Sequence, residues 1–227
     1  VLFMFKPTHI EKETNFSLEP FKEILKDKRN INLYIFGSTN YGLYYVLQSV
    51  IGKKFLEDFC LMSTYKAAMV LSCMAVIGAL ANIINAYVCK LCHNHRVKFL
   101  KHASVITFGC LLIICICLIF NIRTPYIAAL FTILSANASL SSILVPVLHL
   151  TNRKMISGTA VSIMNFCFFT MVGILGTAMG FLLNIFPSEL KSGVAIYSNN
   201  SYLLVFGLFF ILSVFEMYKA MKLSDKY

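Results

Sequence analysis

Six long apolar runs constrain this chain more than any other feature of its sequence. Each run approaches or exceeds the about 20 residues that an α-helix needs to cross about 30 Å of hydrocarbon. Hydrophobic residues make up 58% of the chain and charged residues 13%, whereas a soluble globular domain carries about 25% charged residues. The sequence therefore predicts an all-α integral membrane protein with a six-transmembrane-helix bundle. The runs are Ile31–Gly52, Thr64–Val88, Ala103–Ile122, Pro125–Leu150, Ser157–Phe186 and Tyr202–Tyr218.

The positive charge is distributed unevenly between the two sides that six spans define. Lysine and arginine concentrate before the first span, in the loops after the second and fourth spans, and in the tail after the last span. Basic residues flank membrane spans mainly on the cytoplasmic side. We therefore expect both the N and the C terminus in the cytoplasm. We attribute the net charge of +10 to topology and lipid headgroups rather than to nucleic acid.

This topology divides the chain into four segments. Val1–Phe5 is apolar but too short to span, so we expect it to be the end of a preceding transmembrane helix in a longer chain. Residues 6–30 are expected to form a cytoplasmic linker with a short amphipathic helix over Leu18–Arg29. A solvated linker with a transient helix is the alternative. Residues 31–218 would form the six-helix bundle, and residues 219–227 a cytoplasmic tail.

The first span carries a row of polar side chains on one face. On a helix of about 3.6 residues per turn, these side chains fall within about 40° of one line. Polar groups are costly against lipid, so the row should face protein or a water-filled path. Tyr44 is a further mid-span tyrosine, whereas Thr39 and Asn40 lie off this row. Hydrogen-bonded helix packing is the alternative to cavity lining. The row consists of Tyr34, Ser38, Tyr41, Tyr45 and Gln48.

The later spans repeat this gradation of polarity. Small residues share a face with Asn82 and Asn85 in the second span and with Asn165 in the fifth, which favours close helix packing. The third and sixth spans are the most uniformly apolar. The order polar, small-faced and apolar thus occurs twice, which predicts 3+3 repeats like those of many secondary transporters. The fourth span has its own polar face, formed by Thr132, Ser135, Ser139, Ser142 and Pro146.

This organisation resembles the C-terminal half of a major facilitator superfamily transporter, helices seven to twelve. The six spans, the cytoplasmic termini and the basic linker carry the resemblance, which covers essentially the whole chain. The loop after the second span keeps Lys90, Arg96 and Lys98 of the family's basic motif, with Asn85 in place of its glycine and Cys89 in place of its acid. The resemblance implies that the first and fourth spans line a central cavity. It also implies that the partner is an N-terminal six-helix half of the same chain.

The same loop holds two cysteines and two histidines, Cys89, Cys92, His93 and His95. Cys-x-x-Cys-His is a haem attachment pattern, and two cysteines with two histidines could bind zinc. Haem attachment of this type occurs outside the cytoplasm, whereas the charge distribution indicates that this loop lies inside. Four ligands so close in sequence also make poor tetrahedral geometry. We therefore expect no metal and no other cofactor.

Signatures of enzymes are missing from the sequence. It contains no Gly-x-Ser-x-Gly, no His-Glu-x-x-His and no phosphate-binding Gly-rich loop. Glu216 falls in the last turn of the sixth predicted span, so no carboxylate is expected inside a span away from its end. We expect no enzyme activity. We also expect any proton-carrying carboxylate to lie outside this segment, or transport to proceed without one here.

These features together predict a secondary active transporter, such as a symporter, in the cell (inner or plasma) membrane. It would move a small polar solute, such as an amino acid or a sugar, by alternating access. A six-span subunit that does not transport and a channel-like homo-oligomer are the alternatives. Beyond the solute, lipid and the N-terminal half, a coupling proton or cation is a further expected partner. The candidate substrate-binding residues are Tyr41, Tyr45, Gln48, Tyr44, Ser38, Ser135, Ser139, Ser142 and Asn165.

Overall fold

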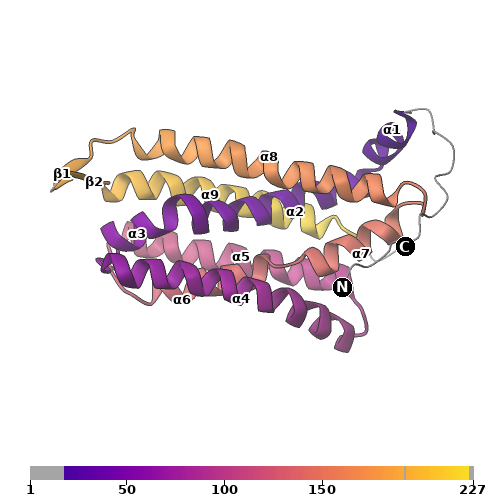
Figure 1. Cartoon of the computed structure of the whole chain (residues 1–227), viewed down its shortest axis with the longest axis horizontal. Helices are drawn as coiled ribbons and strands as arrows, with labels where there is room; N and C mark the ends of the chain where they lie inside the picture. The colour runs from indigo at the N-terminus through magenta and orange to yellow at the C-terminus, as the bar shows by residue number, and fades with distance from the viewer. Residues whose placement is uncertain (1–17, 192, 225–227) are drawn as a thin grey trace, which may run out of the picture.

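The computed structural model describes residues 18–191 and 193–224 and shows an elongated bundle of helices that run side by side (Figure 1). The segment expected at Val1–Phe5 lies outside the described residues. A short antiparallel hairpin, β1 (Glu189–Lys191) and β2 (Val194–Ile196), joins the last two helices and is not predicted by the sequence. The helical elements are α1 (Glu19–Lys26), α2 (Lys28–Val46), the π-helical segment η1 (Leu47–Ile51), α3 (Gly52–Asp58), α4 (Thr64–Leu91), α5 (Arg96–Ile119), α6 (Ile127–Ala138), α7 (Ser141–Thr151), α8 (Ser157–Leu183) and α9 (Asn199–Met221).

Five helical segments of the described chain are long and apolar enough to cross a membrane. They are α4, α5, the α6–α7 pair, α8 and α9, which is the arrangement of a multi-pass membrane protein. The predicted all-α membrane class is therefore confirmed. The expected first span, Ile31–Gly52, is not among the five, so neither a six-span bundle nor a 3+3 repeat is shown.

α2, which contains most of this first expected span, is largely buried by protein. α2 packs against α8 and α9, and it buries Asn30, Ser38, Thr39 and Asn40 beside its apolar residues. Buried polar groups of this kind are normally hydrogen-bonded. The Tyr34 hydroxyl, for example, donates to the backbone carbonyl of Ala160 on α8 at 3.1 Å. The polarity of α2 thus reflects a protein environment rather than lipid.

The helix α1 lies within the range expected for the linker helix, Leu18–Arg29. Pro20 occupies its first turn, where the missing N–H removes no helical hydrogen bond. Ile24 is fully buried, and the exposed Glu23 pairs with Arg153 in the connection between α7 and α8. These contacts attach α1 to the end of the bundle.

α2, η1 and α3 follow one another as one continuous rod, in which the helix changes from α-helical to π-helical hydrogen bonding at η1. The Gly52 N–H donates to the carbonyl of Leu47, five residues earlier, which is the hydrogen bond of a π-helix. A Cβ atom at position 52 would lie 2.1 Å from that carbonyl oxygen, so only glycine fits there without a shift of the backbone. Such π-helical turns are frequent at functional sites. Gln48 lies within this turn.

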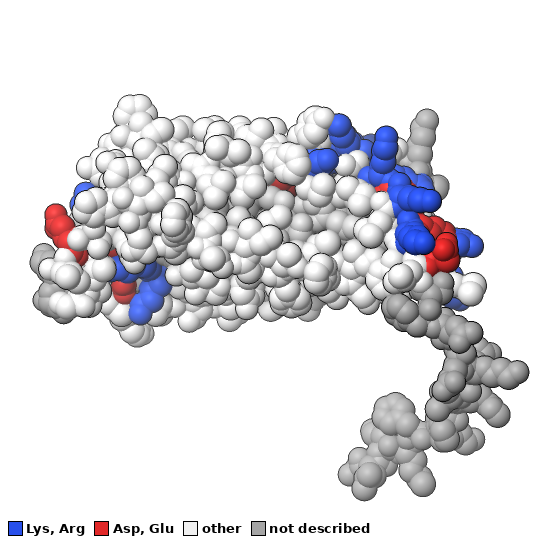
Figure 2. Space-filling view, turned by 90° about the horizontal axis from the view of Figure 1, so that it is seen from above, with Lys and Arg blue, Asp and Glu red and all other residues white. Residues whose placement is uncertain are grey.

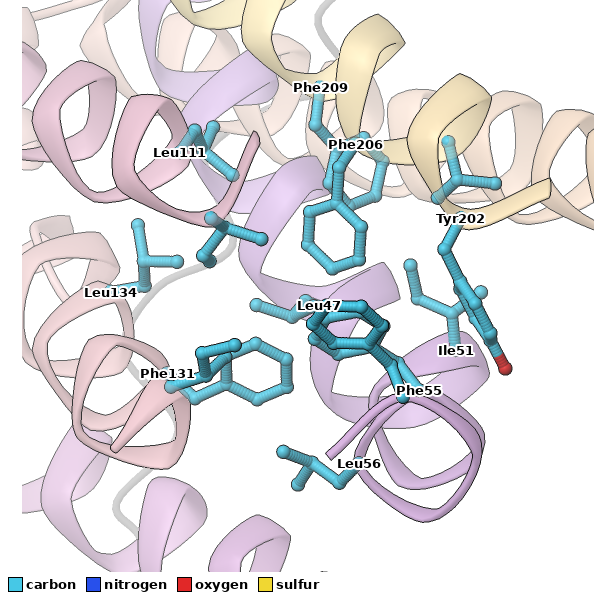
Figure 3. Packing of buried hydrophobic residues seen from close by; sticks show 14 of the residues in the cluster. Leu47, Ile51, Phe55, Leu56, Leu111, Phe131, Leu134, Tyr202, Phe206 and Phe209 are labelled. Carbon is cyan, nitrogen blue, oxygen red and sulfur yellow. The ribbon is translucent and has the colours of Figure 1, made fainter. Parts of the chain in front are cut away.

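Two hydrophobic clusters, one toward each end of the bundle, form the core of the described chain. Figure 3 shows the first cluster, in which Phe55 of α3 packs among aromatic rings from other helices. Its ring centroid lies 4.5 Å from that of Phe206, 5.1 Å from that of Tyr202 and 5.8 Å from that of Phe131. The second cluster includes Leu33 and other apolar residues near α1.

Charged side chains gather at the two ends of the bundle, and the band between them is almost free of charge (Figure 2). Lysine and arginine are more prominent at the end where Figure 1 shows α1 and the connection between α7 and α8. A band of this kind is suited to the hydrocarbon of a bilayer, where isolated charges are costly.

Candidate functional site

A layer of polar side chains separates the two hydrophobic clusters. Along the helices that form this layer, the hydrophobic residues that precede the polar side chains and those that follow them belong to different clusters. On α2, for instance, Phe36 belongs to one cluster and Leu43 to the other. Polar residues at this depth are rare in membrane helices and commonly mark a pathway or binding site. This polar layer comprises Asn40, Ser104, Thr107, Ser135, Asn137, Ser213 and Glu216, all buried or partly buried.

The expected continuous span Pro125–Leu150 is interrupted at the depth of the polar layer. α6 ends at Ala138 and α7 begins at Ser141, with Ser139 in a non-helical conformation between them. An interruption exposes backbone groups that would otherwise pair within the helix. In a membrane protein such groups must be satisfied by protein or face a water-filled cavity.

Two asparagines of α4 satisfy the interrupted backbone. The Asn85 amide donates to the carbonyls of Ala136 and Ser139, at 2.9 and 3.0 Å. Asn82 accepts the backbone N–H of Ser142 at 3.1 Å, and its amide donates to the Ser141 hydroxyl at 2.7 Å. The asparagine face that the sequence indicates as a packing surface therefore also caps both sides of a broken helix.

A cavity of about 240 Å³ lies next to this interruption. We call it the central cavity. Ser139 and Ser141 border it at the interruption, and Asn82 borders it from α4. From α2 it is lined by Gly37, Asn40, Tyr41 and Tyr44, and from α8 by Asn165, Phe168 and Phe169. No charged residue of the described chain contributes to its wall, so hydroxyl, amide and aromatic groups provide its chemistry.

Four of the predicted substrate-binding residues line the central cavity: Tyr41, Tyr44, Ser139 and Asn165. Tyr41 is held by stacking on Phe168, with ring centroids 4.9 Å apart and planes 15° apart. Because these four residues come from α2, α8 and the interruption between α6 and α7, their convergence depends on the tertiary fold. Their role in binding stays a prediction.

Tyr45 and Gln48, two predicted residues of the row in the first expected span, lie outside this wall. The Tyr45 ring stacks on Tyr41 at 5.6 Å between centroids, and the residue is 38% exposed. Gln48 lies in η1, and its amide donates to the Leu71 carbonyl at 3.5 Å. Tyr45 therefore supports a wall residue, whereas Gln48 connects the π-helical turn to α4.

The three remaining predicted serines also lie outside the wall and use their hydroxyls on backbone carbonyls. Ser38 donates within α2, while Ser135 and Ser142 donate to carbonyls of α4. These two α4 contacts join the broken helix to its neighbour on both sides of the interruption. In the structure, then, Ser135 and Ser142 hold helices together.

The structure corrects the expectation that this segment holds no carboxylate away from a span end. α9 continues to Met221, and Glu216 is fully buried within the bundle. Asn40 donates to its Oε1 at 2.8 Å. A weak signal for this contact exists in the sequence, since Asn40, Thr107 and Asn137 are polar residues within apolar runs. Their convergence on one level could not be read from any one helix.

The basic residues of the resemblance motif occupy the connection between α4 and α5. Lys90 lies in the last turn of α4, whereas Arg96 and Lys98 lie in the first turn of α5. Of the nearby cysteines, Cys89 is buried and Cys92 is exposed. The part of the chain that the structure describes contains no grouping of three or more His, Cys, Asp or Glu residues that could hold a metal ion.

No protein-family model matches the sequence, and no curated protein matches it.

Proposed function

We propose that this chain is the C-terminal six-helix half of a secondary active transporter of the major facilitator type, in which α2, η1 and α3 form the first span in addition to the five long apolar segments. The observation that supports this most is the central cavity beside the interruption between α6 and α7. In many secondary transporters, substrate sites lie near the bilayer midplane at interrupted helices. The cavity here occupies that kind of position, at the depth of the polar layer between the two hydrophobic clusters.

The lining of the cavity favours a small, uncharged or zwitterionic polar solute, such as an amino acid or a sugar. Amides from Asn82 and Asn165 can donate and accept hydrogen bonds, and hydroxyls from Tyr44 and Ser139 can do both. The Tyr41 ring offers an apolar surface for the less polar part of a solute. The volume of about 240 Å³ is below the about 300–1,000 Å³ usual for drug-sized ligands.

Two broad apolar faces support a partner half. In the most apolar 18-residue stretch of α4, only 22% of the residues are buried within the described chain. The same share is buried in the corresponding stretch of α8. Exposed side chains include Ile83 on α4 and Phe166 and Phe169 on α8. Since α4 and α8 both contribute to the central cavity, a second bundle on these faces would complete its walls. Rocking of the two halves would then open the cavity alternately to each side.

An uptake screen of radiolabelled amino acids and sugars, in cells that express the full gene, tests this function. We expect saturable uptake of one solute class. Asn165→Ala and Ser139→Ala should each raise KM by about tenfold, because a lost hydrogen bond removes about 1–1.5 kcal/mol of binding. The matched control is Thr177→Val, since Thr177 is exposed on α8 and bonds only to its own helix at Gly173.

The alternatives give different results in this screen. A channel-like oligomer would give uptake that does not saturate, and a subunit that does not transport would give none. Saturable uptake with unchanged KM in both cavity variants would argue against the central cavity as the solute site.

A further inference from the structure

Glu216 is a fully buried carboxyl group with an incomplete set of partners. Its Oε1 accepts the Asn40 amide at 2.8 Å. Its Oε2 is buried and has no hydrogen-bond partner among the described residues. An ionised carboxylate offers about four lone-pair sites to donors. A single amide donor therefore leaves most of its hydrogen-bonding capacity unused.

No cation on the helices around Glu216 forms an ion pair with it in the described chain. α8 contains no charged residue, and α2 carries charge only at its start. Lys219, the nearest cation on α9, lies over the Phe215 ring, and the exposed His102 ring is paired with the Lys98 carbonyl. The ionisable groups on the helices packed here are Lys28, Arg29, Tyr34, Tyr41, Tyr44 and Tyr45 of α2, Arg96, Lys98, Lys101, His102, Cys110, Cys115 and Cys117 of α5, Cys167 of α8, and Tyr202, Tyr218 and Lys219 of α9.

The balance of these effects favours a protonated carboxyl group in this conformation. Burial of an unpaired charge costs several kcal/mol, and one hydrogen bond from an amide returns only about 1.5–3 kcal/mol. A neutral carboxylic acid avoids that cost, and its C=O can still accept the Asn40 amide. The arrangement thus suits a carboxyl group that holds a proton while it is enclosed.

Asn40 connects this carboxyl group to the central cavity. Its amide donates to Glu216 and also to the Thr107 hydroxyl at 3.2 Å, while the residue forms part of the cavity wall. Asn137, directly before the interruption between α6 and α7, donates to the same Thr107 hydroxyl at 2.7 Å. A hydrogen-bonded chain therefore runs from the carboxyl group past the cavity wall to the broken helix.

We propose that Glu216 is a proton-binding site, and that Asn40 links its protonation to solute occupancy of the central cavity. The coupling rests on the proposed transport function, whereas the proton site itself does not. A proton from water on one side forms an O–H bond at Glu216. When that bond breaks, the electron pair stays on the carboxylate and the proton passes to water on the other side. Loss of the proton requires more donors, so Asn40 and Thr107 must reorient, which changes the cavity wall.

Infrared spectroscopy of the full chain in lipid vesicles tests the proton site without any transport assay. Surface carboxyl groups ionise near pH 4, so at neutral pH a band from a protonated carboxyl group should remain in the wild type. We expect Glu216→Gln to remove it and Glu189→Gln, at an exposed position, to leave it. The band should shift in Asn40→Leu, which lacks the amide donor, and should disappear as the pH rises while the protein stays folded.

Two results would overturn the proton site. One is the absence of any such band in the wild type at neutral pH. The other is a band that persists at every pH at which the fold survives, which would indicate a permanently neutral, structural acid. Because these readings come from the wild type, they hold even if the Glu216→Gln chain folds poorly.

Transport then separates the coupling from the proposed function. In vesicles, Glu216→Gln should lose accumulation driven by a pH gradient but keep solute exchange at equal pH. An unchanged response of Glu216→Gln to the pH gradient would refute the coupling while transport itself stands. A titrating band in a protein that carries no solute would instead refute the transport function and the coupling, and would leave the proton site intact.

Discussion

Replacement of Asn82 by leucine is expected to destabilise the bundle and to abolish solute uptake. The variant loses the acceptor for the Ser142 N–H, at the start of α7, and the donor to the Ser141 hydroxyl. A buried polar group left without a partner costs about 1–3 kcal/mol, and the partial burial of the Ser142 N–H favours the lower end of that range. Thermal unfolding of the purified protein in detergent should show a lower midpoint than the wild type.

The matched control is Asn184→Leu. Asn184 is exposed directly after α8, and its amide donates to the Gly180 carbonyl in the last turn of that helix. An exposed substitution of this kind changes stability by about 0.5 kcal/mol or less. If Asn82→Leu unfolds at the wild-type temperature and still transports, the interruption does not depend on the asparagine cap.

Replacement of Asp58 by alanine is expected to give the second large effect, at the opposite end of the bundle from α1. The Asp58 carboxylate accepts the Tyr202 hydroxyl at 2.9 Å, the Tyr197 N–H at 3.0 Å and the Lys54 ammonium at 2.8 Å. It thereby joins α3 to the residue that follows β2 and to α9. Its side chain is 5% exposed and that of Lys54 is 23% exposed. Removal of one partner of a buried pair costs about 3–5 kcal/mol, and the partial exposure of Lys54 favours the lower end of that range.

Chemical unfolding of Asp58→Ala, Lys54→Ala and the double variant checks this expectation. The double variant should lose less stability than the sum of the two single variants, because each single change leaves the other group without its partner. Lys53→Ala is the control, since Lys53 is 48% exposed and lies 3.9 Å from Glu57. Additive effects at positions 54 and 58 would show that the pair does not act as a unit.

The helices themselves could be predicted from the sequence because apolar segments in lipid must satisfy their backbone internally. The apolar runs at α4, α5, α8 and α9 could therefore be predicted as helices. The convergence of Tyr41, Tyr44, Ser139 and Asn165 on one cavity also follows in part from helical periodicity, which places polar side chains on particular faces.

The features that were not predicted depend on contacts between distant segments. The interruption at Ser139 requires acceptors and donors from α4, and Asn82 reads as a packing residue when α4 is considered alone. In the sequence, Glu216 lies near the end of the last apolar run. Its burial and its contact with Asn40, which place it inside the bundle, appear only in the structure. The η1 turn likewise depends on the glycine at position 52, which in the sequence simply ends an apolar run.

The central cavity and the polar layer together suggest how solute and proton could share one conformational change. Tyr44 and Asn40 border the cavity, and both also line a small space of about 10 Å³ beside Thr107. A change in the side-chain position of either residue therefore alters the lining of both spaces. The interruption beside Ser139 lies at the same depth, between two helical segments.

Side-specific thiol labelling of Ser139→Cys tests the central claim, a cavity that opens alternately to each side of the membrane, most directly. The background would carry serine in place of Cys73, Cys92 and Cys167, the cysteines that are exposed or partly exposed. A membrane-impermeant thiol reagent should label the introduced thiol in right-side-out vesicles and also in inside-out vesicles. The solute found by the uptake screen should slow labelling in both kinds of vesicle. Labelling that never occurs, occurs from one side only, or ignores the solute would contradict alternating access at this cavity.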